Sequence, residues 1–419
     1  MADTSVAPQA RLTGDQASAT VLRGIGPIKA LTFLMFMMFA MTTDSVGVII
    51  PQIIKTFHLS MAAAGSFQYA TMGGIALAGL GLGFLADRFG RKTTIVLGLS
   101  VFALNALLFA VSNTFAAFLA LLFVSGAAIG VFKTGALALI GDISTSTTAH
   151  TTTLNALEGF FGVGAIVGPA IVTRLLLAGA SWKWLYVIAG ALCGILIAIA
   201  VRYPKTVAAT QTPVDLARTL CLARSPYATG FSLGAMLYVG VETAIYVWMP
   251  TYLEGYRGPA VTLAAYAISV FFVLRAAGRF LGSWMLSRLD WSATLALCSL
   301  AILICFTGAL LGGKGVAVYL LPLSGLFMSV IYPTLNSKGI SCFPKSEHGA
   351  AAGLILFFTC VSAVLAPLAM GVVSDAFGDA KWGFVMATSV AALLFAGLCA
   401  NWLLAPTRQR LCQLDASEY

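Results

Sequence analysis

The chain has 419 residues, of which 59% are hydrophobic and only 9% are charged, against about 25% charged residues in an ordinary soluble domain. A soluble protein of this size needs far more polar surface, so the composition excludes a soluble enzyme, a disordered protein and a nucleic-acid-binding protein. The net charge of +9 has to be interpreted by position, because basic residues also orient membrane proteins.

The apolar residues are gathered into segments long enough to cross a membrane, since a spanning helix needs about 20 mostly apolar residues. About twelve such segments lie at approximately 30–53, 64–85, 94–112, 115–139, 153–178, 184–201, 229–252, 261–285, 292–312, 316–336, 350–372 and 383–404. The residues before the first segment are polar and lack the short apolar core of a signal peptide. We therefore expect an all-α, multi-pass membrane protein that contacts the lipid bilayer.

The longest polar interval between two segments runs from Arg202 to Pro226 and divides the chain into six helices plus six. The domain organisation that we predict is an N-terminal tail (1–28), a first six-helix half (29–201), a central loop (202–227), a second six-helix half (228–405) and a C-terminal tail (406–419).

The positions of the basic residues predict the orientation of the chain. With the N-terminus in the cytoplasm, sixteen of the 24 lysines and arginines fall on the cytoplasmic side and six on the other side. The remaining two, Lys133 and Arg275, fall within helices. Because cytoplasmic loops are enriched in lysine and arginine, we expect both termini and the central loop to be cytoplasmic, in the inner membrane of a bacterial cell.

A glycine-rich, charged motif connects the second and third segments. It reads Gly83-Phe84-Leu85-Ala86-Asp87-Arg88-Phe89-Gly90-Arg91-Lys92. This motif resembles the G-x-L-a-D-r-x-G-r-K signature of the major facilitator superfamily, and it falls in the loop where that family carries it. A degenerate copy at Gly278, Arg279, Gly282 and Arg288 stands at the matching place in the second half, as parallel repeats predict.

The resemblance implies a transporter with two six-helix halves that rock about a substrate site near the membrane midplane. The charged motif would then be a gating motif of Gly83, Asp87, Arg88, Gly90, Arg91 and Lys92. We expect a monomer that is not an enzyme and has no cofactor beyond a transported H⁺ or Na⁺. We expect no metal site, because the eight cysteines form no C-x-x-C pair and the three histidines are isolated.

Several shorter segments resemble the subfamily of sugar:cation symporters that includes the fucose permease. They are Asp44 with Ile50-Pro51-Gln52, Leu154-Asn155, Tyr238-Val239-Gly240-Val241-Glu242, and Phe327 to Thr334. Lys133 is a departure, because the fourth span of the fucose permease carries an acidic residue there. A second resemblance is to a drug:proton antiporter motif, and it is carried by Gly164-Ala165-Ile166-Val167-Gly168-Pro169. The plain alternative for these residues is close packing between helices.

Five ionisable residues fall within the predicted spans: Asp44, Lys133, Glu158, Glu242 and Arg275. A charge in the hydrocarbon layer costs at least about 2.5–3.5 kcal/mol, so such residues are usually functional. The acids outnumber the bases by one, and a surplus carboxylate can take up a proton or ligate Na⁺. We predict Asp44, Glu242 and Glu158 as coupling-ion residues. The alternative is that static ion pairs with Lys133 or Arg275 fix the helix packing.

Polar and aromatic residues near the midplane are candidates for the substrate site. Amides hydrogen-bond to sugar hydroxyls, and aromatic faces stack on sugar rings. The candidates are Gln68, Tyr69, Lys133, Asn155, Tyr246, Trp248, Arg275, Tyr332 and Asn336. Helix-to-helix hydrogen bonding for the amides and an interfacial belt for Tyr246 and Trp248 are the alternatives.

The sequence thus predicts a secondary transporter of a small polar solute, most simply a sugar carried with H⁺ or Na⁺. Two other transport functions stay open. One is drug:H⁺ antiport, and the other is organic-anion transport in which Lys133 and Arg275 clamp a carboxylate.

Overall fold

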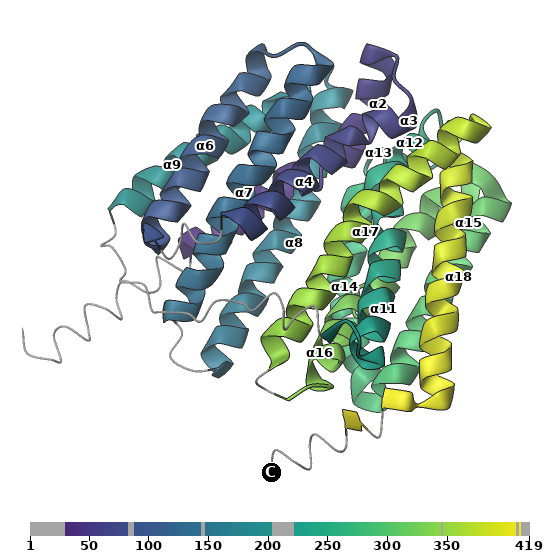
Figure 1. Cartoon of the computed structure of the whole chain (residues 1–419). Coiled ribbons are helices and arrows are strands. Elements are labelled where there is room, and N and C mark those ends of the chain that lie inside the picture. The colour runs from purple at the N-terminus through teal and green to yellow at the C-terminus, as the bar shows by residue number, and fades with distance from the viewer. Residues whose placement is uncertain are drawn as a thin grey trace, which may run out of the picture.

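The computed structural model of the chain describes residues 30–82, 88–143, 147–202, 222–344, 347–407 and 410–411. The regular elements in these ranges are helices, and they form two bundles that lie side by side (Figure 1). The first bundle contains the helix at 30–43, α2 (Val46–Phe57), α3 (Met61–Ala64), α4 (Ser66–Gly81), α6 (Arg91–Val111), α7 (Phe115–Ile143), α8 (Thr147–Leu177) and α9 (Trp184–Val201). The second contains α11 (Pro226–Thr243), the π-helix η1 (Ala244–Trp248), α12 (Met249–Leu253), α13 (Val261–Ala265), α14 (Ala267–Arg288), α15 (Trp291–Met328), α16 (Ile331–Ser341), α17 (His348–Phe377) and α18 (Ala380–Leu404).

The described elements are consistent with twelve membrane spans, six in each bundle. Ten stretches of the described chain are long and apolar enough to cross a bilayer. The stretch Trp291–Ser341 has 51 residues, which is two crossings at about 20 residues each, and the chain turns between them at Gly313, where φ is +62°. The 16-residue helix α4 lies at the second span that the sequence predicts, and residues outside the described ranges follow Leu82.

Polar caps fix where several helices begin. The carboxylate of Asp290 accepts a 3.0 Å hydrogen bond from the N–H of Ser292 at the start of α15. The carboxylate of Asp379 accepts a 2.8 Å bond from the N–H of Lys381 at the start of α18. Such caps satisfy backbone donors that the first helical turn leaves unpaired.

Glycines let helices approach closely within each half, because they have no side chain to keep the backbones apart. A Cβ at Gly126 on α7 would lie 2.1 Å from the carbonyl oxygen of Thr71 on α4. A Cβ at Gly278 on α14 would lie 2.1 Å from the carbonyl oxygen of Leu326 on α15. Neither position has room for any larger residue without a shift of the backbone.

The first and seventh spans are both interrupted next to an acidic residue. The first changes from the helix at 30–43 to α2 through a turn at Asp44 and Ser45. The seventh changes from α11, which contains Glu242, into η1 directly after Thr243. Because π-helical segments and broken membrane helices are frequent at functional sites, both interruptions point to the same region of the interface.

The two bundles meet mainly toward one end of the molecule. There α17 packs on α3 and α4, and α2 packs on η1 and α12, while α8 packs on α14 across the same interface. In Figure 1 the bundles converge toward the end that carries α2, α3 and α12. We call this the sealed end.

Candidate functional site

A buried ion pair joins the seventh and eighth spans. Nη1 of Arg275, on α14, lies 2.6 Å from Oε1 of Glu242, on α11. The hydroxyl of Tyr238 donates a 3.1 Å hydrogen bond to the same oxygen, and its ring stacks on that of Tyr332 with centroids 6.3 Å apart. A buried charge needs such partners, since a carboxylate stripped of water and left unpaired is strongly destabilising. The partners of Glu242 in the described part of the chain therefore come from the second half.

Asp44 lies at the interruption of the first span and has no such partner. Its carboxylate accepts one long hydrogen bond, 3.4 Å, from the hydroxyl of Thr43. Within the described ranges it forms no ion pair, although the charges of Arg275, Glu242 and Lys133 act on it from a greater distance. Asp44 is thus a half-buried carboxylate at the interface that has no ion-pair partner among the described residues.

Lys133 lies on α7 and is held by aromatic rings. Its Nζ lies 5.8 Å from the centroid of Phe36 and 5.3 Å from that of Phe39, both on the helix at 30–43. Cation–π attraction of this kind is worth about 0.5–2 kcal/mol. The charges of Glu158 and Asp44 also act on the ammonium group, but neither forms an ion pair with it in the described part of the chain.

Glu158 is exposed although it lies within the span formed by α8. Its charge acts on Lys133 and on Arg275 and Tyr332 of the second half. A carboxylate that faced lipid would be costly, so these neighbours place it toward the interface between the halves. The five ionisable residues that the sequence places in the membrane therefore form one electrostatic cluster.

The two cations of the predicted carboxylate clamp have different surroundings. A clamp made of Lys133 and Arg275 requires both cations to be available, but Arg275 is engaged by Glu242 at 2.6 Å. Of the two predicted cations, Lys133 is the one without a carboxylate partner in the described structure.

The other predicted substrate residues divide between two places. Gln68 is fully buried, and both atoms of its amide lack a hydrogen-bond partner within the described structure, as does the hydroxyl of Tyr69. The Nε1–H of Trp248 donates a 3.0 Å bond to the carbonyl of Pro367 across the second half. The Tyr69 hydroxyl and the Trp248 ring both border Gly65, so these residues lie together near the sealed end.

Tyr332 and Asn336 lie on α16, where Tyr332 contacts the charged cluster through Tyr238. Asn336 is half-buried, and its Oδ1 is without a partner among the residues described. Tyr246 lies in η1, and its carbonyl oxygen approaches Gly47 of the first half. Asn155 lies in α8, but its side chain is outside the described part of the chain.

The predicted gating motif is described only in part. Gly83 and Asp87 lie outside the described residues. Gly90 has φ of +85° at the start of α6, a backbone conformation that glycine adopts readily. Arg91 is buried, whereas Arg88 is exposed and lies over the ring of Phe89. Lys92 donates a 2.8 Å hydrogen bond to the carbonyl of Val201, which ties α6 to the end of α9.

The glycines of the antiporter-like segment support the plain alternative, which is helix packing. A Cβ at Gly164 would lie 2.0 Å from the carbonyl oxygen of Met37, and one at Gly168 would lie 2.2 Å from that of Met41. Both contacts bring α8 against the first span. Close packing therefore accounts for both glycines.

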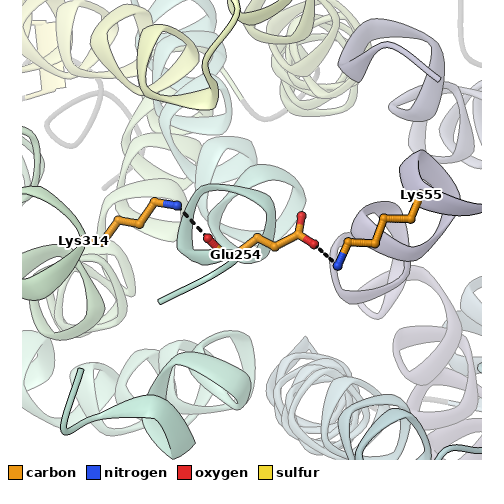
Figure 2. Close-up of polar contacts among 3 residues, drawn as sticks. All are labelled: Lys55, Glu254 and Lys314. Atoms are coloured by element: carbon orange, nitrogen blue, oxygen red, sulfur yellow. Dashed lines mark hydrogen bonds and ion pairs between the residues drawn. The ribbon is translucent and has the colours of Figure 1, made fainter. Parts of the chain in front are cut away.

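Sequence reasoning did not identify the polar contacts at the sealed end. Lys55 on α2 forms an ion pair with the carboxylate of Glu254, which follows α12. Lys314 donates a 2.6 Å hydrogen bond to the main-chain carbonyl of Glu254. Figure 2 shows Glu254 between the two lysines, with one side chain from the first half and one from the second.

Further hydrogen bonds cross between the halves. The Thr173 hydroxyl donates to the carbonyl of Ala265 at 3.1 Å, and the Ser269 hydroxyl donates to that of Ile166 at 3.0 Å. A recess of about 360 Å³ lies beside them, with Lys55, Glu254 and Thr173 in its lining. The only sequence signal for these contacts is the presence of polar residues near span ends.

Comparison with known proteins decides the family. The family model described as Major Facilitator Superfamily matches residues 32–367. The chain belongs to the major facilitator superfamily. It is 26% identical over 415 residues to the L-fucose-proton symporter of Escherichia coli strain K12, covering 90% of this chain and 94% of that protein. It is also 26% identical over 365 residues to the glucose/galactose transporter of Brucella abortus, covering 82% of this chain and 87% of that one.

Solved structures confirm the fold of this superfamily member. The nucleoside transporter NupG matches with a TM-score of 0.72 at 16% identity, covering 90% of this chain and 98% of that chain. A variant of the fucose:proton symporter FucP of Escherichia coli matches with a TM-score of 0.61 at 23% identity, covering 88% of this chain and 97% of that chain. The chain is therefore a multi-pass integral membrane protein with the two-half architecture that the sequence predicts.

Proposed function

We propose that this chain is a secondary active transporter that carries a sugar or a related polar solute together with a cation. The observation that carries the proposal is the charged cluster at the interface of the halves, with Asp44 and Lys133 in the first half and Glu242 and Arg275 in the second. A site shared by both halves can be exposed to either side of the membrane in turn when the halves rock. The relatives named as fucose-proton and glucose/galactose transporters favour a sugar.

Asp44 is the coupling residue in this proposal, and the coupling ion is a proton. Its carboxylate lacks an ion pair in the described structure, so it can bind and release a cation without first breaking one. A sodium ion needs several oxygen ligands at once, whereas the side-chain oxygen of Thr43 is the one polar partner that Asp44 has among the described side chains. Glu242 is restrained by Arg275 and Tyr238 and has a supporting role.

The sealed end is the extracellular end in this proposal, and the conformation is open toward the cytoplasm. The excess of lysine and arginine on the side of the termini and of the central loop supports that orientation. The protein would act as a monomer, without cofactor, in the inner membrane of a bacterium.

Transport by purified, reconstituted protein tests this function. Proteoliposomes with an imposed pH gradient are assayed for uptake of labelled L-fucose, D-galactose and D-glucose, and then for exchange without a gradient. The variant Asp44→Asn should lose gradient-driven accumulation and keep exchange. Asp379→Asn is the matched control, because Asp379 is an exposed helix cap that is no part of the cluster. Accumulation by Asp44→Asn at the level of the wild type would contradict the assignment.

A further inference from the structure

We infer that Lys133 binds a carboxylate group of the transported solute, so that the substrate is an acidic sugar such as a hexuronate or a hexonate. The inference rests on the proposed function and names the class of its substrate. It is carried by the position of Lys133, which is a cation within a membrane span that has no anionic partner in the described structure.

Among the described residues, the contacts of Lys133 leave its hydrogen-bonding capacity unused. An ammonium group has three donors, and this one rests on the faces of Phe36 and Phe39 at 5.8 and 5.3 Å. Ring faces attract the charge but offer no oxygen acceptor. Arg275 provides the comparison, because the other cation of the cluster has a carboxylate at 2.6 Å. Lys133 is the place in the cluster where an added carboxylate would complete an ion pair.

Among the described residues, the helices of the opposite half that face Lys133 offer no unpaired carboxylate. Across the interface, the α17 residue that interacts electrostatically with Lys133 is Cys360, which is exposed. The sequence of α16 contains no aspartate or glutamate, and that of α17 has only Asp375, which is bound at the sealed end. Glu242 of α11 is engaged by Arg275. A solute between the halves is therefore the natural source of the anion.

The charges of the cluster also link such a solute to the coupling cation. The Glu242–Arg275 pair is neutral as a unit. The remaining charges of the cluster are the two carboxylates of Asp44 and Glu158 and the single ammonium group of Lys133. An entering carboxylate adds a second uncompensated negative charge, and nearby negative charges favour the protonated form of a carboxyl group. Binding of an acidic sugar would thus be accompanied by proton uptake, as cotransport requires.

Calorimetric binding with matched neutral and acidic sugars tests the inference. The full-length protein, purified in detergent, is titrated with D-galactose, D-galacturonate, D-glucose and D-glucuronate at one pH and ionic strength. A charge-assisted hydrogen bond strengthens binding by about tenfold to a hundredfold. The protein with Lys133 intact should therefore bind the acid of each pair at least about tenfold more tightly than the neutral sugar. The variant Lys133→Gln should lose that preference, and Lys133→Arg should keep most of it. Lys381→Gln, at an exposed lysine outside the cluster, should leave it unchanged.

Two outcomes overturn the inference, and they are distinguishable from failure of the proposed function. Equal or tighter binding of the neutral sugars overturns it, and so does an unchanged acid preference in a well-folded Lys133→Gln variant. If proteoliposomes accumulate neutral sugars under a pH gradient while acids neither bind nor compete, the inference fails and the function stands. If neither class binds or exchanges in folded protein, both fail.

Discussion

The carboxylate of Asp375, near the end of α17, accepts a 2.7 Å hydrogen bond from the main-chain N–H of Met61, at the start of α3. Its second oxygen accepts a 2.8 Å bond from the N–H of Ala62. An acidic residue of the second half thus caps a helical turn of the first half. These contacts hold the sealed end together, because the two halves cannot separate there without exposing both N–H groups and the carboxylate.

Removing this cap should favour opening of the sealed end. Hydrogen bonds to a charged group are worth about 1.5–3 kcal/mol each, so Asp375→Ala should raise the population of the state open at this end by at least about tenfold. Spin labels at Thr114 and Gly315, exposed residues at this end of the two halves, report the separation by pulsed electron resonance. An unchanged distance distribution would show that the cap does not control the equilibrium.

Asp379→Ala is the matched control for that measurement. Asp379 caps α18 through Lys381 and therefore acts within the second half only. It should lower stability slightly and leave the label separation as in the wild type.

The Lys55–Glu254 ion pair should contribute less than the Asp375 cap. The side chains are 63% and 32% exposed, and exposed ion pairs are worth about 0–1 kcal/mol. We expect Lys55→Gln to shift the label distances only slightly. The exchange Lys55→Glu with Glu254→Lys should restore the wild-type distribution. A double-mutant cycle on the open population gives the coupling energy, and a value above about 2 kcal/mol would contradict this ranking.

Neutralising Glu242 should destabilise the folded protein much more strongly than loss of the exposed Lys55–Glu254 ion pair. Glu242→Gln leaves Arg275 as an uncompensated charge in the membrane, and breaking one side of a buried pair costs about 3–5 kcal/mol. Thermal unfolding in detergent should show a clearly lowered Tm, and Glu242→Gln combined with Arg275→Gln should recover most of it. If the single variant unfolds at the wild-type Tm, then water or another group already compensates the charge of Arg275.

The sequence was sufficient for the fold because the relevant signals are local. Long apolar segments specify the spans, and the distribution of lysine and arginine predicts the orientation. The five intramembrane charges also stand out by composition alone, since a charge within an apolar segment is costly wherever its partner lies.

The pairing of those charges could not be predicted from the sequence, because it depends on how α11 and α14 turn toward each other. Arg275 and Glu242 are 33 positions apart in the chain and meet only through the packing of the second half. The contacts of Asp375 with α3 depend on the relative position of the halves, which changes during transport. No local pattern encodes a contact between residues that lie in different halves of the molecule.

A glycine at the crossing of the first and seventh spans provides a test of that interface. A Cβ at Gly47 on α2 would lie 1.9 Å from the carbonyl oxygen of Tyr246 in η1, so Gly47→Ala requires the two halves to move apart. Gly164→Ala places a Cβ 2.0 Å from the carbonyl oxygen of Met37, but this crossing lies within the first half. We therefore expect Gly47→Ala to lengthen the distance between the labels at Thr114 and Gly315. Gly164→Ala should instead lower the Tm and leave that distance unchanged, and the reverse pattern would show that the halves do not separate between α2 and η1.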